Sequence, residues 1–191
     1  EGGATYHTRY KTFEFFRGQE GDPWYPQVAP APELECASPR SGPWWNQDWK
    51  NRSVMQREEL QPQSLTFNSG IDFIRRNGGD ENWFLQIETF DPHEPFFTHR
   101  KYKDLYPEHY DNYKGKHFDW PPYAPVSETP EEVEHCRYEC ASLVSMCDQR
   151  MGDILDIMDA QNMWDDTMLI VWTDYGFLLG EHDCWAKMWM P

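Results

Sequence analysis

The chain has 191 residues, which is enough for one domain with a sizeable core. Its formal net charge of −16 disfavours nucleic-acid binding through general electrostatic attraction, although a local cationic pocket can still bind a small anion. Aromatic residues make up 16% of the chain, and this content argues against disorder. No apolar run reaches the roughly 18 residues that a membrane span needs, so we expect none in this chain.

The first third of the chain lacks a clear hydrophobic period. Residues 1–62 are rich in Trp, Pro and Gly, and the segments 21–26 and 30–32 are typical of extended, turn-rich structure. We therefore expect residues 1–62 to be irregular and residues 63–191 to form an α/β portion. Both belong to one domain in this interpretation.

Three segments after residue 62 have clear patterns. Residues 64–76 carry helically spaced apolar side chains and end at Asn77-Gly78, which is a helix stop signal. Residues 82–88 are predicted to form a buried strand that leads directly into residues 91–96. Residues 97–128 form a connection rich in Tyr and Pro.

The clearest helix is predicted over residues 130–160. Thr129 is a favourable N-cap, Pro130 suits the first helical position, and Glu132 completes a capping box. Apolar residues recur at steps of three and four along about eight turns. A short apolar strand is predicted over residues 167–173, with Asp174 at its end.

Strands that alternate with helices predict an α/β fold with a mostly parallel sheet flanked by helices. Ligands of such folds bind beyond the carboxyl ends of the strands. Two polar segments lie there, 91–93 after the first predicted strand and 174–187 after the second. The sequence therefore predicts a binding site where these segments meet.

Three side chains of these segments are candidates for chemistry, each with an ordinary structural alternative. His93 lies between two prolines and can bind an anion or protonate a leaving group, or it is a plain loop histidine. Lys187, among aromatic residues, suits an oxyanion, or it is a surface lysine. Asp174 suits a hard cation such as calcium, or it caps a turn.

The five cysteines form no CxxC pair and no even set, which disfavours both a disulfide framework and a zinc site. Cys136, Cys140 and Cys147 fall on one face of the predicted helix and are interpreted as buried apolar residues. This usage favours a reducing compartment, such as the cytoplasm, over a periplasmic or secreted location.

The segment 173–187, Thr-Asp-Tyr-Gly-Phe-Leu-Leu-Gly-Glu-His-Asp-Cys-Trp-Ala-Lys, resembles a conserved segment of the sulfatases. That segment has Asp-His-Gly, then Leu-Gly-Glu-His, then a Lys. Residues 84–88 followed by 91–96 resemble the family's strand and its Pro-His-x-Pro-Phe loop. The resemblance is good over residues 80–191 and looser over residues 1–62.

The resemblance implies part of an alkaline phosphatase-like α/β domain with one divalent metal, usually calcium. It implies that His93 and Lys187 bind the sulfate group and that Asp174 is a metal ligand. Position 175 would be the next metal ligand, although the family has His or Asn there and this chain has Tyr175. The substrate implied is a small sulfated compound, for which carbohydrate sulfates are one class.

The family's nucleophile is a formylglycine, made from a Cys/Ser-x-Pro-x-Arg motif that this chain lacks. Residues 36–40, Cys-Ala-Ser-Pro-Arg, place the proline one position late, and we interpret them as coincidence. We therefore expect no catalytic residue in this chain and expect the formylglycine upstream, in a parent sulfuric ester hydrolase of which this is an internal piece. A phosphoester or phosphonate monoester hydrolase and a non-catalytic binding domain remain the alternatives.

Overall fold

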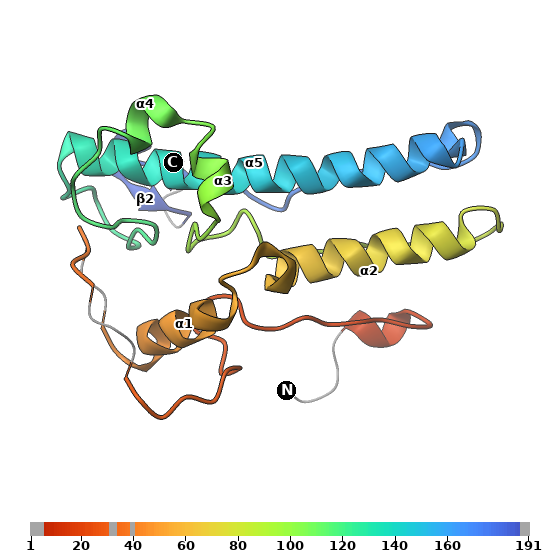
Figure 1. The fold of residues 1–191 in the computed structure, drawn as a ribbon, viewed down its shortest axis with the longest axis horizontal. Coiled ribbons are helices and arrows are strands. Elements are labelled where there is room, and N and C mark those ends of the chain that lie inside the picture. Colours follow the sequence, from red (N-terminus) through yellow and green to blue (C-terminus); the bar gives the residue numbers. More distant parts are fainter. Residues whose placement is uncertain (1–5, 31–33, 39–40, 188–191) are drawn as a thin grey trace.

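The computed structural model describes residues 6–30, 34–38 and 41–187, and most of its regular secondary structure is helical (Figure 1). The helices, with 3-10 helices labelled η, are η1 Tyr6–Arg9, α1 Pro43–Val54, η2 Glu58–Leu60, α2 Pro62–Asn77, α3 Arg100–Lys103, α4 Pro107–Tyr110, α5 Pro130–Ala160, η3 Met163–Asp165 and η4 Glu181–Asp183. The strands β1 Leu178–Leu179 and β2 Trp185–Ala186 form an antiparallel pair. Among these described helices, none has the length and apolar character needed to cross a membrane.

Both predicted helices are confirmed, as α2 and α5. In α5 the capping box forms as expected: the Thr129 hydroxyl accepts from the Glu132 N–H at 3.3 Å, and the Glu132 carboxylate accepts from the Thr129 N–H at 3.0 Å. Its apolar stripe is buried at Cys136, Leu143, Ile154 and Met158 and partly buried at the positions between them. Helix α2 begins two residues earlier than predicted, because Pro62 occupies its first turn.

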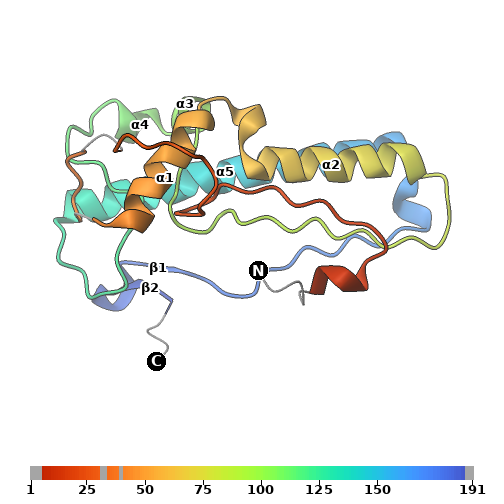
Figure 2. The ribbon, with the colours of Figure 1, turned by 90° about the horizontal axis from the view of Figure 1, so that it is seen from below.

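Helices α2 and α5 lie side by side, and an extended segment runs back beneath each of them (Figures 1 and 2). Their facing sides share a core made of Ile71, Ile74, Ile154, Met158 and Met163. Trp83, Leu85, Ile87 and Leu169, from the two extended segments, pack against this core. Gly70 permits the close approach of α2 to the first segment, because a Cβ there would lie 2.3 Å from Ile87 Cδ1.

The two predicted strands, 82–88 and 167–173, are extended but are not paired as strands, so this part of the prediction is wrong. Between residues 83 and 88 the side chains alternate inward and outward, as a strand's do. Among the described residues, the one backbone hydrogen bond that leaves either segment is local, from the Thr167 N–H to the Met163 carbonyl of η3. Alternating apolar side chains indicate that a segment is extended and which of its faces is buried. A β-strand also needs a neighbouring strand to which its backbone is hydrogen-bonded. The expected parallel sheet is therefore not present among the described residues, and β1–β2 is antiparallel.

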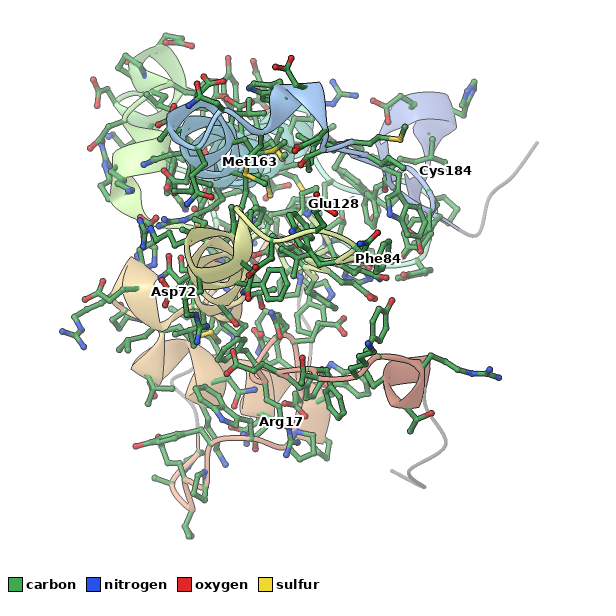
Figure 3. The ribbon with its side chains drawn as sticks, turned by 90° about the vertical axis from the view of Figure 1, so that its right-hand side faces the viewer. Arg17, Asp72, Phe84, Glu128, Met163 and Cys184 are labelled. Carbon is green, nitrogen blue, oxygen red and sulfur yellow. The ribbon has the colours of Figure 1, made fainter. Side chains whose placement is uncertain are left out.

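The two extended segments, 82–88 and 167–173, form a layer whose outer face is apolar and open to solvent. Met168, Ile170 and Trp172 are 83%, 71% and 73% exposed, and Phe84 is 74% exposed. Figure 3 looks along the helix pair and shows Phe84 on the side of the molecule away from Asp72 of α2. So large an exposed apolar surface is unusual for a monomeric protein in solution and marks a contact surface.

A second core lies at the first half of α5 and supports the loops described below. Its buried members are Phe96, Tyr102, Phe118, Cys136, Leu143, Met146, Trp185 and Ala186. They come from the loop after the first extended segment, from α3, from residues 117–120, from α5 and from β2. Chain segments that are distant in sequence are thus fixed against one face of one helix.

Helix α1 lies within residues 1–62, which the sequence analysis expects to be irregular. Its buried side chains are polar, namely Asp48, Asn51 and Arg52, so hydrophobic periodicity does not reveal it. Arg52 bonds Asp48 at 2.7 Å and Asp119 at 2.5 Å, all three being about 2% exposed. Burial, partly offset by Arg52, raises the pKa of Asp48 to about 6, whereas Arg52 and His117 outweigh burial and hold that of Asp119 far below its usual range.

Helix α4 is fixed to α5 by stacked rings. His109 Nε2 lies 2.9 Å from His135 Nδ1, and His109 stacks on Tyr138 with 4.1 Å between ring centroids. Tyr113 stacks on His135 at 3.9 Å. Burial is the largest cause that lowers the pKa of His135 to about 3, with neighbouring His109 and Lys103 adding to it. His135 is therefore neutral in the folded chain at physiological pH.

The outward position of Ile170 predicts that an Ile170→Asp substitution leaves stability nearly unchanged and reduces self-association. Leu169→Asp, one residue away on the inward face, is the matched control. It should lower the free energy of unfolding by roughly 2 kcal/mol or more, because it places a charge against a packed core. Urea unfolding and sedimentation measure the two effects. Equal destabilisation by both substitutions would show that residue 170 is not outward-facing.

The buried His135 predicts a loss of stability in acid. Between about pH 6.5 and pH 3 the unfolded chain binds a proton at this residue that the folded chain does not. Stability therefore falls as the pH drops through this window. His135→Gln should reduce the loss between pH 7 and pH 5 by on the order of 1–2 kcal/mol, measured by urea unfolding. His182→Gln, at an exposed position, should not; an identical pH dependence of both variants would contradict the assignment.

Candidate functional site

The loop 91–95 brings His93 to the edge of the second core. Phe96, directly after this loop, is fully buried, and its ring meets Phe177 edge-on at 5.5 Å. Its N–H donates to the Asp119 carbonyl at 2.7 Å. The ring of His93 also packs against Phe90, with 4.2 Å between the centroids. The loop is therefore anchored at both ends, and the imidazole is held in one region.

Lys187 is positioned by the β1–β2 pair that precedes it. In this pair Leu179 lies opposite Trp185, and Leu178 lies opposite Ala186. Trp185 is fully buried, and its indole N–H donates to the Glu128 carboxylate at 2.8 Å. The tight connection depends on Gly180, whose φ of 96° favours glycine. Lys187 thus follows two buried residues whose backbone is fixed.

The structure brings His93 and Lys187 together, although they are 94 positions apart in sequence. Lys187 Nζ lies 2.5 Å from His93 Nε2, so the imidazole accepts a hydrogen bond from the ammonium group. On the other side of the ring, His93 Nδ1 lies 2.5 Å from the Glu94 carbonyl oxygen and 3.1 Å from Glu94 Oε2. Two acceptors at Nδ1 place the ring proton there.

Glu94 is the residue of this site that sequence reasoning misses. Its side chain is 1% exposed. Glu94 Oε2 lies 3.4 Å from Lys187 Nζ, and the Tyr123 hydroxyl donates to Glu94 Oε1 at 2.9 Å. The only sequence signal is its place between His93 and Pro95, and Tyr123 carries no signal at all. The Glu94 carboxylate therefore links its own loop to the segments that carry Tyr123 and Lys187.

The side chain of Tyr175 contacts Lys187. Its hydroxyl accepts from Lys187 Nζ at 3.0 Å, and the ammonium lies 4.5 Å from the centre of its ring. Burial alone would lower the pKa of Lys187, but the Tyr175 hydrogen bond and the Glu94 charge outweigh it, and the pKa is raised. Lys187 is therefore a stable cation, suited to bind an oxyanion.

Asp174 is exposed at the end of the second extended segment. Calcium takes six to eight oxygen ligands, and within the described residues no three His, Cys, Asp or Glu side chains gather to hold a metal. In the part of the chain that the structure describes, such side chains therefore do not gather around Asp174. Metal binding by Asp174 and Tyr175 stays a prediction.

Two other residues of the sequence analysis lie outside this cluster. Burial raises the pKa of Asp91 to about 7, and the polar contacts described for the His93 imidazole are with Glu94 and Lys187, not with Asp91. Cys36 is buried beside His117, and burial raises the pKa of its thiol. Such a thiol is a poor nucleophile, in line with the interpretation of residues 36–40 as coincidence; Pro39 and Arg40 lie outside the described residues.

A hollow of about 550 Å³ lies elsewhere, between α4 and the start of α5. Its charged lining consists of four carboxylates, from Glu108, Glu131, Glu132 and Glu134, and one ammonium group, from Lys114. Four carboxylates outweigh one lysine, so the net charge of this hollow disfavours a sulfate or phosphate group. The cluster of His93, Lys187, Tyr123 and Tyr175 remains the better anion site.

Comparison with known proteins agrees with this geometry. The sulfatase family matches residues 4–188. A choline-sulfatase of Rhizobium meliloti (strain 1021) is 28% identical over 138 residues, which are 63% of this chain and 27% of that protein. An arylsulfatase of Clostridium perfringens (strain 13 / Type A) is 22% identical over 160 residues, which are 75% of this chain and 32% of that protein.

The chain thus spans about a third or less of the length of these relatives. The family match nevertheless extends over almost all of its residues and includes both candidate anion-binding side chains. The chain belongs to the sulfatase family.

Proposed function

We propose that this chain supplies the anion-binding part of the active site of a sulfuric ester hydrolase. The contact of Lys187 Nζ with His93 Nε2 carries the proposal, because it places a stable cation and an imidazole at one point. Membership of the sulfatase family supports it, as do the names of the two relatives. The ligand is a small sulfate ester, and carbohydrate sulfates are one candidate class.

The two side chains have distinct roles in this proposal. An incoming sulfate oxygen takes the place of His93 as acceptor for the Lys187 ammonium, so that binding exchanges a neutral acceptor for an anionic one. His93, with its Nδ1 proton held by Glu94, presents Nε2 towards the same point. When Nε2 is protonated, it can donate to the ester oxygen that departs with the alcohol. The Tyr175 hydroxyl accepts from Lys187 and keeps its own proton for a further oxygen.

The nucleophile and most of the metal site come, in this proposal, from other parts of a parent protein. A bound divalent cation would stabilise negative charge on sulfate oxygens, and Asp174, with Tyr175 as the weaker candidate, would contribute to holding it. A formylglycine would be the nucleophile. The extended segments 82–88 and 167–173 would then be strands of a mostly parallel, alkaline phosphatase-like sheet. The location, with the cytoplasm favoured by the five free cysteines, is likewise proposed.

Two alternatives have specific support. A phosphoester or phosphonate monoester hydrolase would use the same cation and imidazole, because both ester classes present oxyanions of similar shape. A non-catalytic binding domain is favoured by Tyr175, whose neutral phenol is a poor calcium ligand. Calcium titration of the parent protein separates the last alternative from the other two, since a protein that binds no calcium would support it.

In the parent enzyme, Lys187→Ala should lower kcat/KM for p-nitrophenyl sulfate about tenfold or more. An oxyanion contact in a closed site contributes several kcal/mol in general, and Lys187 is here the central cation. Lys116→Ala, at an exposed lysine, is the control and should have no effect. Unchanged kinetics of the Lys187 variant would remove this residue from the site.

The 191-residue chain alone should hydrolyse neither aryl sulfates nor aryl phosphates, because its buried Cys36 is unsuited to act as a nucleophile. Release of p-nitrophenol from both esters is the measurement. Turnover that disappears in Cys36→Ala would show instead that residues 36–40 act as a nucleophile motif.

A further inference from the structure

We propose that Glu94 is a specificity-determining residue that makes this site favour singly charged sulfate esters over doubly charged phosphate esters. The proposal rests on the proposed function, since it concerns the same site. It rests also on the buried carboxylate of Glu94, which lies beside the Lys187 ammonium group that binds the ligand.

Glu94 is enclosed by hydrogen-bond donors. Its carboxylate lies 3.4 Å from Lys187 Nζ and 3.1 Å from His93 Nδ1, and it accepts from the Tyr123 hydroxyl at 2.9 Å. The Tyr123 hydroxyl donates to Oε1, whereas Oε2 has no hydrogen-bond partner among the described residues and forms an ion pair with the Lys187 ammonium. Because the side chain is 1% exposed, solvent and salt screen this charge poorly.

The charges of the site therefore nearly cancel. Lys187 contributes one positive charge and Glu94 one negative charge, while His93 accepts a hydrogen bond from Lys187 through Nε2. The Tyr123 and Tyr175 hydroxyls add dipoles without charge. A site of this kind binds an anion through directed hydrogen bonds more than through net positive potential.

The two ester classes differ in charge at neutral and mildly alkaline pH. A sulfate monoester carries one negative charge, whereas a phosphate monoester carries close to two above its second pKa of about 6. Both meet the donors of Lys187 and Tyr175 in the same way. Glu94 repels the second negative charge of the phosphate ester as well as the first. This repulsion acts where the effective dielectric constant is lower than that of water. Discrimination by charge follows from this difference.

A purely structural role for Glu94 predicts a different result. If its carboxylate only joined the three loops, its loss would weaken the binding of both esters by the same factor. The ratio of the two dissociation constants therefore separates a role in specificity from a role in folding.

The test compares dissociation constants of p-nitrophenyl sulfate and p-nitrophenyl phosphate for the chain at pH 8, measured by calorimetry. Glu94→Gln keeps the shape and removes the charge, and it should shift the ratio about tenfold in favour of the phosphate ester. Glu94→Asp keeps the charge, and Glu131→Gln removes an exposed charge on α5. Both should leave the ratio within about twofold of the wild-type value. An unchanged ratio in Glu94→Gln overturns the proposal.

A second comparison needs no variant and so does not depend on the folding of Glu94→Gln. p-Nitrophenyl methylphosphonate has the phosphorus chemistry of the phosphate ester and the single charge of the sulfate ester. Wild-type protein should bind it about as tightly as the sulfate and about tenfold more tightly than the phosphate. If the phosphate ester binds as tightly as the sulfate ester and the methylphosphonate, the inference about Glu94 is overturned but the proposed function is not. Binding of none of the three overturns the proposed function as well.

Discussion

The apolar face of α5 is the surface on which both parts of the anion site depend. Its first half packs against Trp185 and Phe96, which fix Lys187 and the loop of His93. Its second half shares a core with α2, against which the segment leading to that loop packs through Leu85 and Ile87. A helix of 31 residues is about 46 Å long, so one rigid element links these cores. A break in α5 would therefore separate the two side chains without touching either.

The negative charge of Glu94 has two opposite effects at the site: it stabilises Lys187, and it weakens the attraction of Lys187 for an anion. A half-buried ammonium group loses hydration, and a partner carboxylate restores most of that free energy. The same carboxylate then reduces the attraction that Lys187 exerts on an anion. Removal of Glu94 would leave Lys187 more attractive to anions and less well held. Tyr123, through its bond to Glu94, and Tyr175, through its bond to Lys187, limit how far the pair can move.

The sequence predicts those features that one segment determines alone. Helices α2 and α5 follow from apolar spacing and capping, and the inward faces of residues 83–88 follow from alternation. Strand pairing depends on two segments at once, so the hydrophobic pattern of one segment does not reveal it. Helix α1 is held by the buried Arg52 rather than by an apolar stripe, so hydrophobic periodicity does not reveal it either. His93 and Lys187 are candidates because they follow the predicted strands, and the resemblance gives their roles. Glu94 has no comparable signal, because its importance arises only from burial beside Lys187.

Tyr175 shows how geometry changes the meaning of a substitution. In the sequence it is a departure at a metal position, and by itself it favours a lost function. In the fold its hydroxyl accepts from Lys187 and its ring lies 4.5 Å from the ammonium group, so it belongs to the anion-binding side. A phenol that accepts from the cation still has a proton to donate to a ligand oxygen. The residue that weakens the argument for a metal therefore strengthens the argument for an oxyanion, and the two halves of the site must be judged separately.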